Sequence, residues 1–361
     1  MAIIQSIEAG FYRIPLPVVL TDSMHGEMKA FELNTVRVRD ADGAEGVGYT
    51  YTVGRNGAAI DAILTREMPD IFMGEDADRI EALWHKGWWA LHYGGRGGPS
   101  VLAISAFDMA LWDLKAKRAH LPLWNFLGGA DRKVRVYAGG IDLELTPDEL
   151  LRQTEDNLAK GFRAIKMKVG RPKLSEDVEK IRAMRNFLGD GFPLMVDANM
   201  KWSVDEAIRA ARAFQPYDLT WLEEPTIHDP AGHVRIVREG GIPIAAGENL
   251  RTLWEFKQYI ASGGVTFPEP DVTNCGGITP FMKIAHLAEA FNLPLTTHGA
   301  HDVTVHLLAA VPNASFLEAH GFGLDRYIAA PLKIEEGWAL APNQPGHGIV
   351  FDWKGLDSIR G

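Results

Sequence analysis

Eight ionisable residues mark the ends of short apolar runs in the second half of the chain. They are Lys166, Lys168, Asp197, Glu223, Glu248, Asp271, His298 and Glu318. From Lys168 onward they are separated by 29, 26, 25, 23, 27 and 20 residues, about the length of one strand plus one helix. Polar residues that follow successive strands of a (β/α) barrel converge on one mouth. The spacing therefore predicts one site at which basic and acidic side chains exchange protons with a substrate.

Lys166 and Lys168 alternate with Ile165, Met167 and Val169 in this pattern. Alternate side chains of a strand share a face, so both lysines are predicted to point the same way. Repulsion between two ammonium groups, together with burial, lowers a lysine pKa toward the value that a general base needs. An exposed strand face is the alternative for an isolated lysine pair, and the downstream residues argue against it.

The elements that must position this site alternate between strands and helices. The first strand is predicted at residues 134–138, and helices at 148–160, 175–188, 203–214, 231–239, 253–262, 277–291 and 303–310. We therefore predict an α/β fold in which residues 128–321 form a (β/α) barrel. Residues 322–361 are rich in glycine and proline with short strands, and are expected to return to the N-terminal domain.

We predict that residues 1–127 form an α+β unit that precedes the barrel in the sequence. Strands are expected at 3–9 and 31–38, with a hairpin at Asp42-Gly43, and helices over 57–127. Residues 20–29 and 48–55 are predicted to be polar loops between these elements.

Bulk composition narrows the class of protein. The chain has 361 residues and a net charge of −10, which argues against a nucleic-acid-binding surface. It has one cysteine and neither a signal peptide nor an apolar stretch long enough to span a membrane, so we expect a cytoplasmic protein that is not membrane-bound. Barrels with large apolar surfaces commonly assemble, so a homo-oligomer is expected, an octamer or a dimer.

The ordered set of eight residues resembles the enolase superfamily, and within it the mandelate racemase/muconate lactonizing enzyme family. The likeness covers nearly the whole chain, including Pro345-Gly346-His347-Gly348-Ile349. Motifs such as 92–98, 139–143 and 274–279 are similar to those of the sugar-acid branch, the acid-sugar dehydratases and 3,6-anhydro-L-galactonate cycloisomerases. The resemblance implies a modified TIM barrel of the (β/α)7β type, with the α+β domain capping its mouth.

The same resemblance implies a role for each residue of the set. Asp197, Glu223 and Glu248 would hold Mg²⁺, although each alone could be a helix cap or a loop acid. The adjacent Glu224 could be mistaken for the metal ligand in place of Glu223. Strand alternation lets only one of the two point into the mouth, and the resemblance implies that it is Glu223.

The remaining members of the set would act on the substrate. Lys166 and Glu318 would contact its carboxylate, with Glu318 either protonated or paired with a protonated neighbour. Lys168 would be the base on one face, and His298, oriented by Asp271, would serve the other face.

Residues of the capping loops are expected to decide the substrate. His25, Tyr51, Arg55, His92 and Arg96 offer hydrogen-bond donors for hydroxyl groups. Asn199 is a further candidate for substrate binding, and it could instead support the metal site or simply turn the chain. His301 and His320 are expected to be structural.

The resemblance implies an enzyme, a lyase or isomerase that removes the proton α to a carboxylate through an enediolate. We favour β-elimination on a sugar acid, giving a 2-keto-3-deoxy acid by dehydration or by opening of an anhydro ring. The alternative within the family is a mandelate racemase-like racemase or epimerase of a 2-hydroxy acid. A non-catalytic barrel that binds a metal and an acid is disfavoured, because the lysines, the histidine and the metal acids are all retained.

Overall fold

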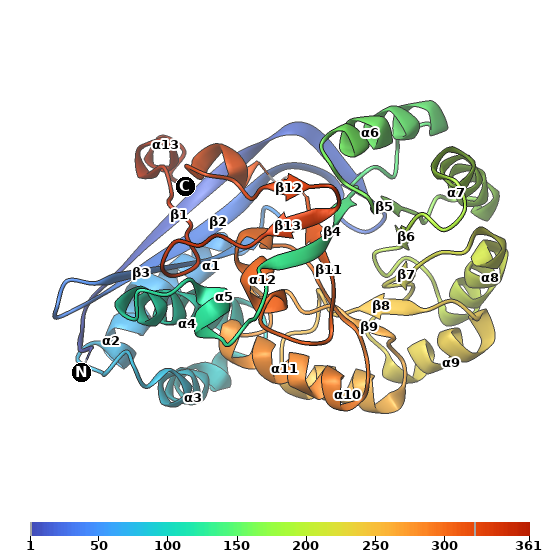
Figure 1. Ribbon diagram of the computed structural model, residues 1–361. Coiled ribbons are helices and arrows are strands. Elements are labelled where there is room, and N and C mark those ends of the chain that lie inside the picture. The colour runs from blue at the N-terminus through green and yellow to red at the C-terminus, as the bar shows by residue number, and fades with distance from the viewer. Residues whose placement is uncertain (1, 321–322) are drawn as a thin grey trace.

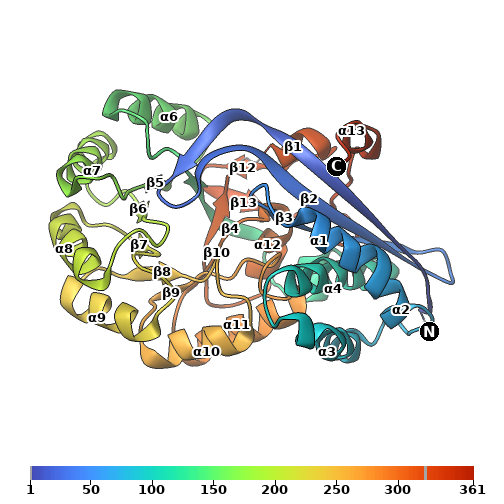
Figure 2. The same ribbon diagram turned by 180° about the vertical axis from the view of Figure 1, so that it is seen from behind.

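The computed structural model describes residues 2–320 and 323–361 and shows a capping sheet lying beside a barrel (Figure 1). The capping sheet has three antiparallel strands in the order β1 (Ile4–Asp22), β2 (Gly26–Asp40) and β3 (Glu45–Thr52). In both ribbon views the β1–β2 hairpin extends beyond the rest of its sheet toward β5 and β6 of the barrel (Figures 1 and 2).

The prediction of two polar loops at residues 20–29 and 48–55 is wrong for most of these residues, which belong to the capping sheet. Most of residues 20–29 belongs to β1 and β2, and only Ser23–His25 form the turn, where the Asp22 carboxylate accepts from the backbone N–H groups of Met24 and His25. Residues 48–52 belong to β3. The polar residues suggested loops, but the tip of the hairpin packs against the barrel and gives them partners there. The Ser23 hydroxyl, for example, donates to the Ala198 carbonyl at 2.7 Å.

Helices of the capping domain occupy the region predicted to be helical. They are α1 (Gly57–Ala62), a π-helical turn at Ile63–Glu67, α2 (Met68–Phe72), α3 (Ile80–Leu91), α4 (Pro99–Arg118) and α5 (Leu123–Phe126). The backbones of α4 and β3 approach so closely that a Cβ at Gly48 would lie 2.0 Å from the Ala106 carbonyl oxygen. Glycine at position 48 is therefore required for this packing.

Eight parallel strands form the near-closed barrel, in the order β10-β11-β4-β5-β6-β7-β8-β9. They are β4 (Lys133–Gly139), β5 (Ile165–Lys168), β6 (Leu194–Asp197), β7 (Leu222–Glu223), β8 (Ile244–Ala246), β9 (Phe267–Pro268), β10 (Leu295–Thr297) and β11 (Ala314–Ala319). The predicted barrel is confirmed. Tyr137, Met195, Trp221 and Phe316 belong to a buried apolar cluster of residues in and beside the strands, so the barrel has a packed core.

The helices that follow the strands agree with the predicted ranges to within about two residues. They are α6 (Pro147–Ala159), α7 (Leu174–Leu188), α8 (Val204–Phe214), α9 (Pro230–Gly240), α10 (Leu253–Ser262), α11 (Ile278–Ala290) and α12 (His301–Leu308). Thr146 and Ser203 form capping boxes with Glu149 and Glu206, which explains where α6 and α8 begin.

The C-terminal segment contacts both parts of the molecule. It comprises a 3₁₀ turn (Leu324–Tyr327), β12 (Ile334–Glu335), β13 (Trp338–Leu340) and α13 (Trp353–Asp357). β13 pairs antiparallel with β4 of the barrel. The backbone of Arg360 forms an isolated antiparallel β-bridge with Tyr12 of β1. The segment thus pairs with a barrel strand and with β1, and its assignment as a segment that returns to the N-terminal domain stays a prediction. The predicted domain limit between residues 321 and 322 lies outside the described residues, and the division into three segments stays a prediction.

Asp113 of α4 joins the tail to the capping sheet. Its buried carboxylate accepts from the backbone N–H groups of His347 at 3.0 Å and of Val47 at 2.9 Å, and it pairs with Lys117 at 2.6 Å. We expect Asp113→Ala to lower the free energy of unfolding by about 2–4 kcal/mol, because two buried donors lose their acceptor. Equilibrium unfolding in urea measures this free energy. Asp205→Ala, at an exposed acid, is the control and is expected to change the free energy of unfolding little. An unchanged midpoint for Asp113→Ala would contradict the assignment.

Across the part of the chain that the structure describes, no helix has the length and apolar character needed to cross a membrane.

Candidate active site

The eight residues of the set lie at the carboxyl ends of the barrel strands, as their spacing predicts. Lys166 and Lys168 belong to β5, Asp197 and Glu223 end β6 and β7, and Glu318 lies in β11. Glu248, Asp271 and His298 follow β8, β9 and β10. All eight side chains are at most 15% exposed, so the parallel strands bring them into one buried group.

Both lysines point into the barrel, as alternation along β5 predicts. The Lys166 Nζ lies 2.5 Å from Glu223 Oε1 and 2.7 Å from Glu318 Oε1. The Lys168 Nζ lies 2.5 Å from Asp197 Oδ2. Lys168 is therefore held by a carboxylate on the neighbouring strand β6, and Lys166 by carboxylates two strands away on either side, on β7 and β11.

The expected lowering of the lysine pKa is wrong for this structure. Burial lowers the pKa of Lys168, but the charges of Asp197, Glu248 and Glu223 together outweigh burial and raise it. The pKa of Lys166 is raised for the same reason, by Glu223 and Glu318. The prediction considered only the two ammonium groups, whereas the barrel also places carboxylates beside them.

Asp197, Glu223 and Glu248 form a compact carboxylate cluster. One oxygen from each can be chosen so that all three lie within 4.8 Å of one another. The Trp221 indole N–H donates to the second Glu223 oxygen at 2.9 Å, and the Asn249 amide donates to Glu248 at 3.2 Å. Other oxygens of the cluster contact Lys166, Lys168 and His298, and a common cation would share these oxygens with the three basic groups.

The neighbouring acid, Glu224, points elsewhere. Its backbone adopts a left-handed conformation with φ of 36°, and its carboxylate contacts Asn249 at 2.9 Å and His228 at 3.3 Å. Glu223 alone of the pair joins the cluster, in agreement with the prediction.

The charge balance of the cluster fits a divalent cation. Burial raises the pKa of Glu248 to about 7, and the charges of Glu224 and Asp197 add to the effect. Burial and the charge of Glu269 also raise the pKa of Glu223. Buried carboxylates at this spacing are stabilised as anions by a hard cation with oxygen ligands, the preference of Mg²⁺.

His298 and Asp271 form a dyad on the other side of the cluster. The His298 Nδ1 lies 2.9 Å from Asp271 Oδ2, and its Nε2 lies 3.2 Å from Glu248 Oε2. Burial lowers the pKa of His298, but Glu248, Glu318 and Asp271 raise it to about 10. Because Asp271 accepts at Nδ1, Nε2 is the atom that faces the cluster and can move a proton there.

The structure distinguishes between the two possibilities for Glu318. Burial raises its pKa, but Lys166, His320 and His298 lower it well below the ordinary value. Glu318 is therefore ionised and paired with Lys166.

A cavity of about 310 Å³ opens between the capping sheet and the barrel mouth. His25, Tyr51, Arg55, Glu248 and His298 are among its lining residues. The remaining lining combines polar residues, among them Thr52, Asn56, Asn249, Arg251 and Asn274, with the apolar residues Val53, Ile60, Pro99 and Leu102. A volume of this order suits a small-molecule ligand, and the polar side chains offer it hydrogen bonds.

Some predicted substrate residues lie apart from this lining. The exposed Arg96 and the half-buried His92, whose Nδ1 contacts the Trp89 carbonyl at 2.7 Å, are not among the lining residues. Asn199 is buried with φ of 44°, and its N–H donates to Asp197 Oδ1 at 2.8 Å. Asn199 thus turns the chain and supports Asp197, and a substrate role for these three residues stays a prediction.

Sequence reasoning missed several residues near the site. Asn249, Arg251 and Asn274 follow strand ends, where position alone could have suggested them. Glu269 is fully buried after β9, and burial raises its pKa to about 8. Glu269 could have been suggested by its position two residues before Asp271, because side chains two residues apart in an extended segment point to the same side.

Tyr51 connects the capping sheet to the dyad. Its hydroxyl donates to Asp271 Oδ2 at 2.6 Å and lies 3.4 Å from His298 Nδ1. We expect Tyr51→Phe to lower kcat about 10-fold, because Asp271 loses a donor that fixes the oxygen facing His298. Steady-state kinetics tests this, with Tyr93→Phe, at a 95% exposed tyrosine, as the matched control. Equal kcat values for the two variants would contradict the role.

The fold and this site define the class of protein. The enolase C-terminal domain-like model matches residues 149–355, and the mandelate racemase/muconate lactonizing enzyme N-terminal domain matches residues 13–128. The chain belongs to the mandelate racemase/muconate lactonizing enzyme family of the enolase superfamily.

Individual relatives refine this placement. The chain is 57% identical to a 3,6-anhydro-α-L-galactonate cycloisomerase of Streptomyces coelicolor over 99% of each chain. It is 39% identical to an L-talarate/galactarate dehydratase of Salmonella typhimurium, over 87% of this chain and 79% of the relative. A crystal structure described as a racemase from Streptomyces coelicolor, with bound magnesium, superimposes with a TM-score of 0.98 at 55% identity, covering 99% of this chain and all of the other.

Proposed function

We propose that this chain is a Mg²⁺-dependent enzyme that removes the α-proton of a sugar acid and eliminates its β-oxygen substituent. The observation that carries this proposal is the placement of two proton-transfer groups on different walls of one carboxylate-lined site. Strand β5, with Lys168, and the end of β10, with His298, are three strands apart in one direction around the barrel order. They therefore reach the cluster from nearly opposite sides.

Asp197, Glu223 and Glu248 would hold the Mg²⁺. When bound, the ion neutralises the negative charge that develops on the substrate carboxylate as the α-proton leaves. The magnesium in the similar Streptomyces coelicolor crystal structure supports this assignment.

Three side chains carry out the remaining steps, and each has a different role. Lys166, held by Glu223 and Glu318, donates to the substrate carboxylate through Nζ. Lys168 would act in its neutral form, which a cation held by Asp197, Glu223 and Glu248 would favour by offsetting the carboxylate charge that raises the Lys168 pKa. Its Nζ then removes the α-proton, which breaks the Cα–H bond and gives the enediolate. His298 then donates a proton from Nε2 to the β-oxygen as the Cβ–O bond breaks, and the resulting enol becomes a 2-keto-3-deoxy acid.

The substrate we favour is a 3,6-anhydro-galactonate, in which elimination opens the anhydro ring without release of water. The 57% identity to the Streptomyces coelicolor cycloisomerase supports this choice over simple dehydration. The hydrogen-bonding groups of His25, Arg55 and Asn249 in the cavity lining support a polyhydroxy acid over an aryl acid such as mandelate.

Proton NMR in D₂O tests the proposal directly. The purified chain is incubated with Mg²⁺ and, separately, hexonates, aldarates, 3,6-anhydro-galactonate or mandelate. We expect loss of the α-proton signal and a new 2-keto-3-deoxy product with 3,6-anhydro-galactonate, and no change when EDTA replaces Mg²⁺. Exchange of the α-proton without a new skeleton would instead establish a racemase or epimerase. No reaction with any acid would contradict the proposal.

We further propose that the protein is a cytoplasmic homo-oligomer, an octamer or a dimer. The exposed Trp89, Tyr93 and Trp254 support assembly, because large apolar side chains at the surface commonly mark interfaces. Analytical ultracentrifugation of the purified chain measures the state, and a monomer at micromolar concentration would contradict it.

A further inference from the structure

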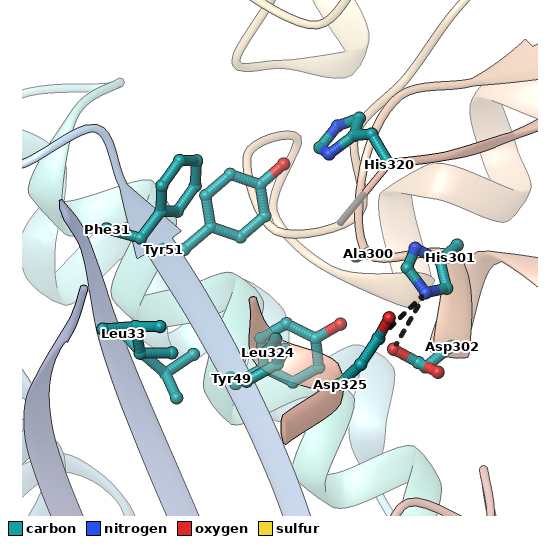
Figure 3. Close-up of a pocket in the computed structure, with 11 residues that line it drawn as sticks. Phe31, Leu33, Tyr49, Tyr51, Ala300, His301, Asp302, His320, Leu324 and Asp325 are labelled. Carbon is teal, nitrogen blue, oxygen red and sulfur yellow. Dashed lines mark ion pairs between the residues drawn. The ribbon is translucent and has the colours of Figure 1, made fainter. Parts of the chain in front are cut away.

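A second group of metal-ligating side chains lies outside the active-site cluster. His301 and Asp302 begin α12, and Asp325 belongs to the 3₁₀ turn of the C-terminal segment. The His301 Nε2 faces both carboxylates, at 3.6 Å from Asp302 Oδ2 and 3.6 Å from Asp325 Oδ1 (Figure 3). These residues share no member with the Asp197, Glu223 and Glu248 cluster.

The distances within this group suit ligands of a common ion better than direct hydrogen bonds. A protonated imidazole bound to a carboxylate closes to about 2.7–2.9 Å. Ligands about 2.0–2.2 Å from a tetrahedral Zn²⁺ are separated from one another by roughly 3.4 Å. The two equal separations of 3.6 Å from one nitrogen match the second arrangement.

A buried hydroxyl without a partner points into the same space. Tyr49 of β3 is 1% exposed, and among the described residues its hydroxyl has no hydrogen-bond partner. Figure 3 shows this hydroxyl directed toward Asp325. A buried hydroxyl without a partner destabilises the folded chain, and a bound ion or its water ligand would supply that partner.

The cavity between these residues has the size and access that an ion needs. It holds about 30 Å³, enough for an ion with one water molecule, and its other walls include Phe31, Leu33 and Leu324. The Asp302 side chain is 6% exposed, whereas that of Asp325 is 45% exposed. An ion can therefore enter beside Asp325 and reach a largely apolar interior.

We propose that His301, Asp302 and Asp325 bind a divalent transition-metal ion of the zinc class, with the Tyr49 hydroxyl completing the site directly or through water. A neutral imidazole and two carboxylates balance the charge of such an ion. Imidazole disfavours Mg²⁺ and Ca²⁺, which take oxygen ligands.

The bound ion would tie together three separate parts of the fold. It joins β3 of the capping sheet, α12 of the barrel and the C-terminal turn. Tyr49 is two residues from Tyr51, and His301 is three residues from His298. The ion therefore fixes the capping sheet beside the dyad and stabilises the folded chain by binding it preferentially.

Co²⁺ binding to the chain saturated with Mg²⁺ tests the site by visible absorption. We expect one equivalent of Co²⁺ to bind with the intense bands of a four- or five-coordinate ion, and Zn²⁺ to displace it. His301→Gln and Asp325→Asn should each weaken binding at least about 100-fold. Tyr49→Phe should shift the bands, and Zn²⁺ should raise the thermal midpoint of the wild-type chain but not those of His301→Gln and Asp325→Asn.

Two further variants separate this site from other sources of binding. Asp197→Asn disrupts the active-site cluster and should retain the Co²⁺ bands, and His286→Gln, at an exposed histidine beside Glu289, should bind as the wild type does. The proposal is overturned if Co²⁺ does not bind in Mg²⁺, if binding survives in both His301→Gln and Asp325→Asn, or if it disappears in Asp197→Asn. None of these readouts depends on the activity proposed above.

Discussion

Replacing Lys168 by alanine is expected to lower kcat at least about 10³-fold while the substrate still binds. Lys168 is the ammonium group closest to Asp197, and general-base catalysis by one side chain contributes about 10²–10⁴-fold. Lys166, which we assign to the substrate carboxylate, remains in place in this variant. The measurements are steady-state kinetics on 3,6-anhydro-galactonate and α-proton exchange in D₂O, both of which should be lost together.

A second substitution separates proton transfer from the loss of an ion pair. Lys168→Arg keeps a cation beside Asp197, but a guanidinium does not give up its proton at neutral pH. It should therefore be nearly as inactive as Lys168→Ala while retaining the stability of the wild type. Lys257→Ala, at an exposed lysine of α10, controls for loss of a surface charge. Wild-type α-proton exchange in either Lys168 variant would show that another group is the base.

Replacing His298 by asparagine is expected to abolish elimination while sparing exchange of the α-proton. Asparagine keeps a donor toward Asp271, which lies 2.9 Å from the histidine ring, but it cannot deliver a proton to the β-oxygen. Product formation should fall about 10²–10⁴-fold. Lys168, on the other wall, should still exchange the α-proton with solvent.

NMR in D₂O follows both events in one sample, so their ratio decides the roles of the two residues. Loss of exchange together with elimination would assign the base to His298 and exchange the two roles. Unchanged elimination would show that the leaving oxygen needs no proton from this residue. His286→Asn provides the matched control, because His286 is exposed and contacts only Glu289 among the partners described.

Much of this molecule follows from local features of its sequence. The interval of about 25 residues between polar strand ends fixed the number and order of the barrel strands, because each β/α unit needs that length. Alternation along β5 placed Lys166 and Lys168 on one face, and the same argument at the end of β7 predicted that Glu223 and Glu224 point in different directions. These are properties of neighbouring residues, which a single chain displays directly.

Other features were decided only by tertiary contacts. Residues 20–29 and 48–52 were expected to be loops, but they are mostly strand, because the hairpin extends onto the barrel and its polar side chains find partners there. The lysine pKa values rise where a fall was expected, since carboxylates from β6, β7 and β11 approach β5 in space.

The sequence by itself determined which residues stand at the mouth of the barrel. The tertiary structure decided which of them touch, and with what electrostatic result. It also brought Tyr49, His301 and Asp325 together from the two ends of the chain, a grouping with no sequence spacing to reveal it. The reason is physical, since periodicity fixes the face that a side chain takes, whereas the charges that surround it come from segments distant in sequence.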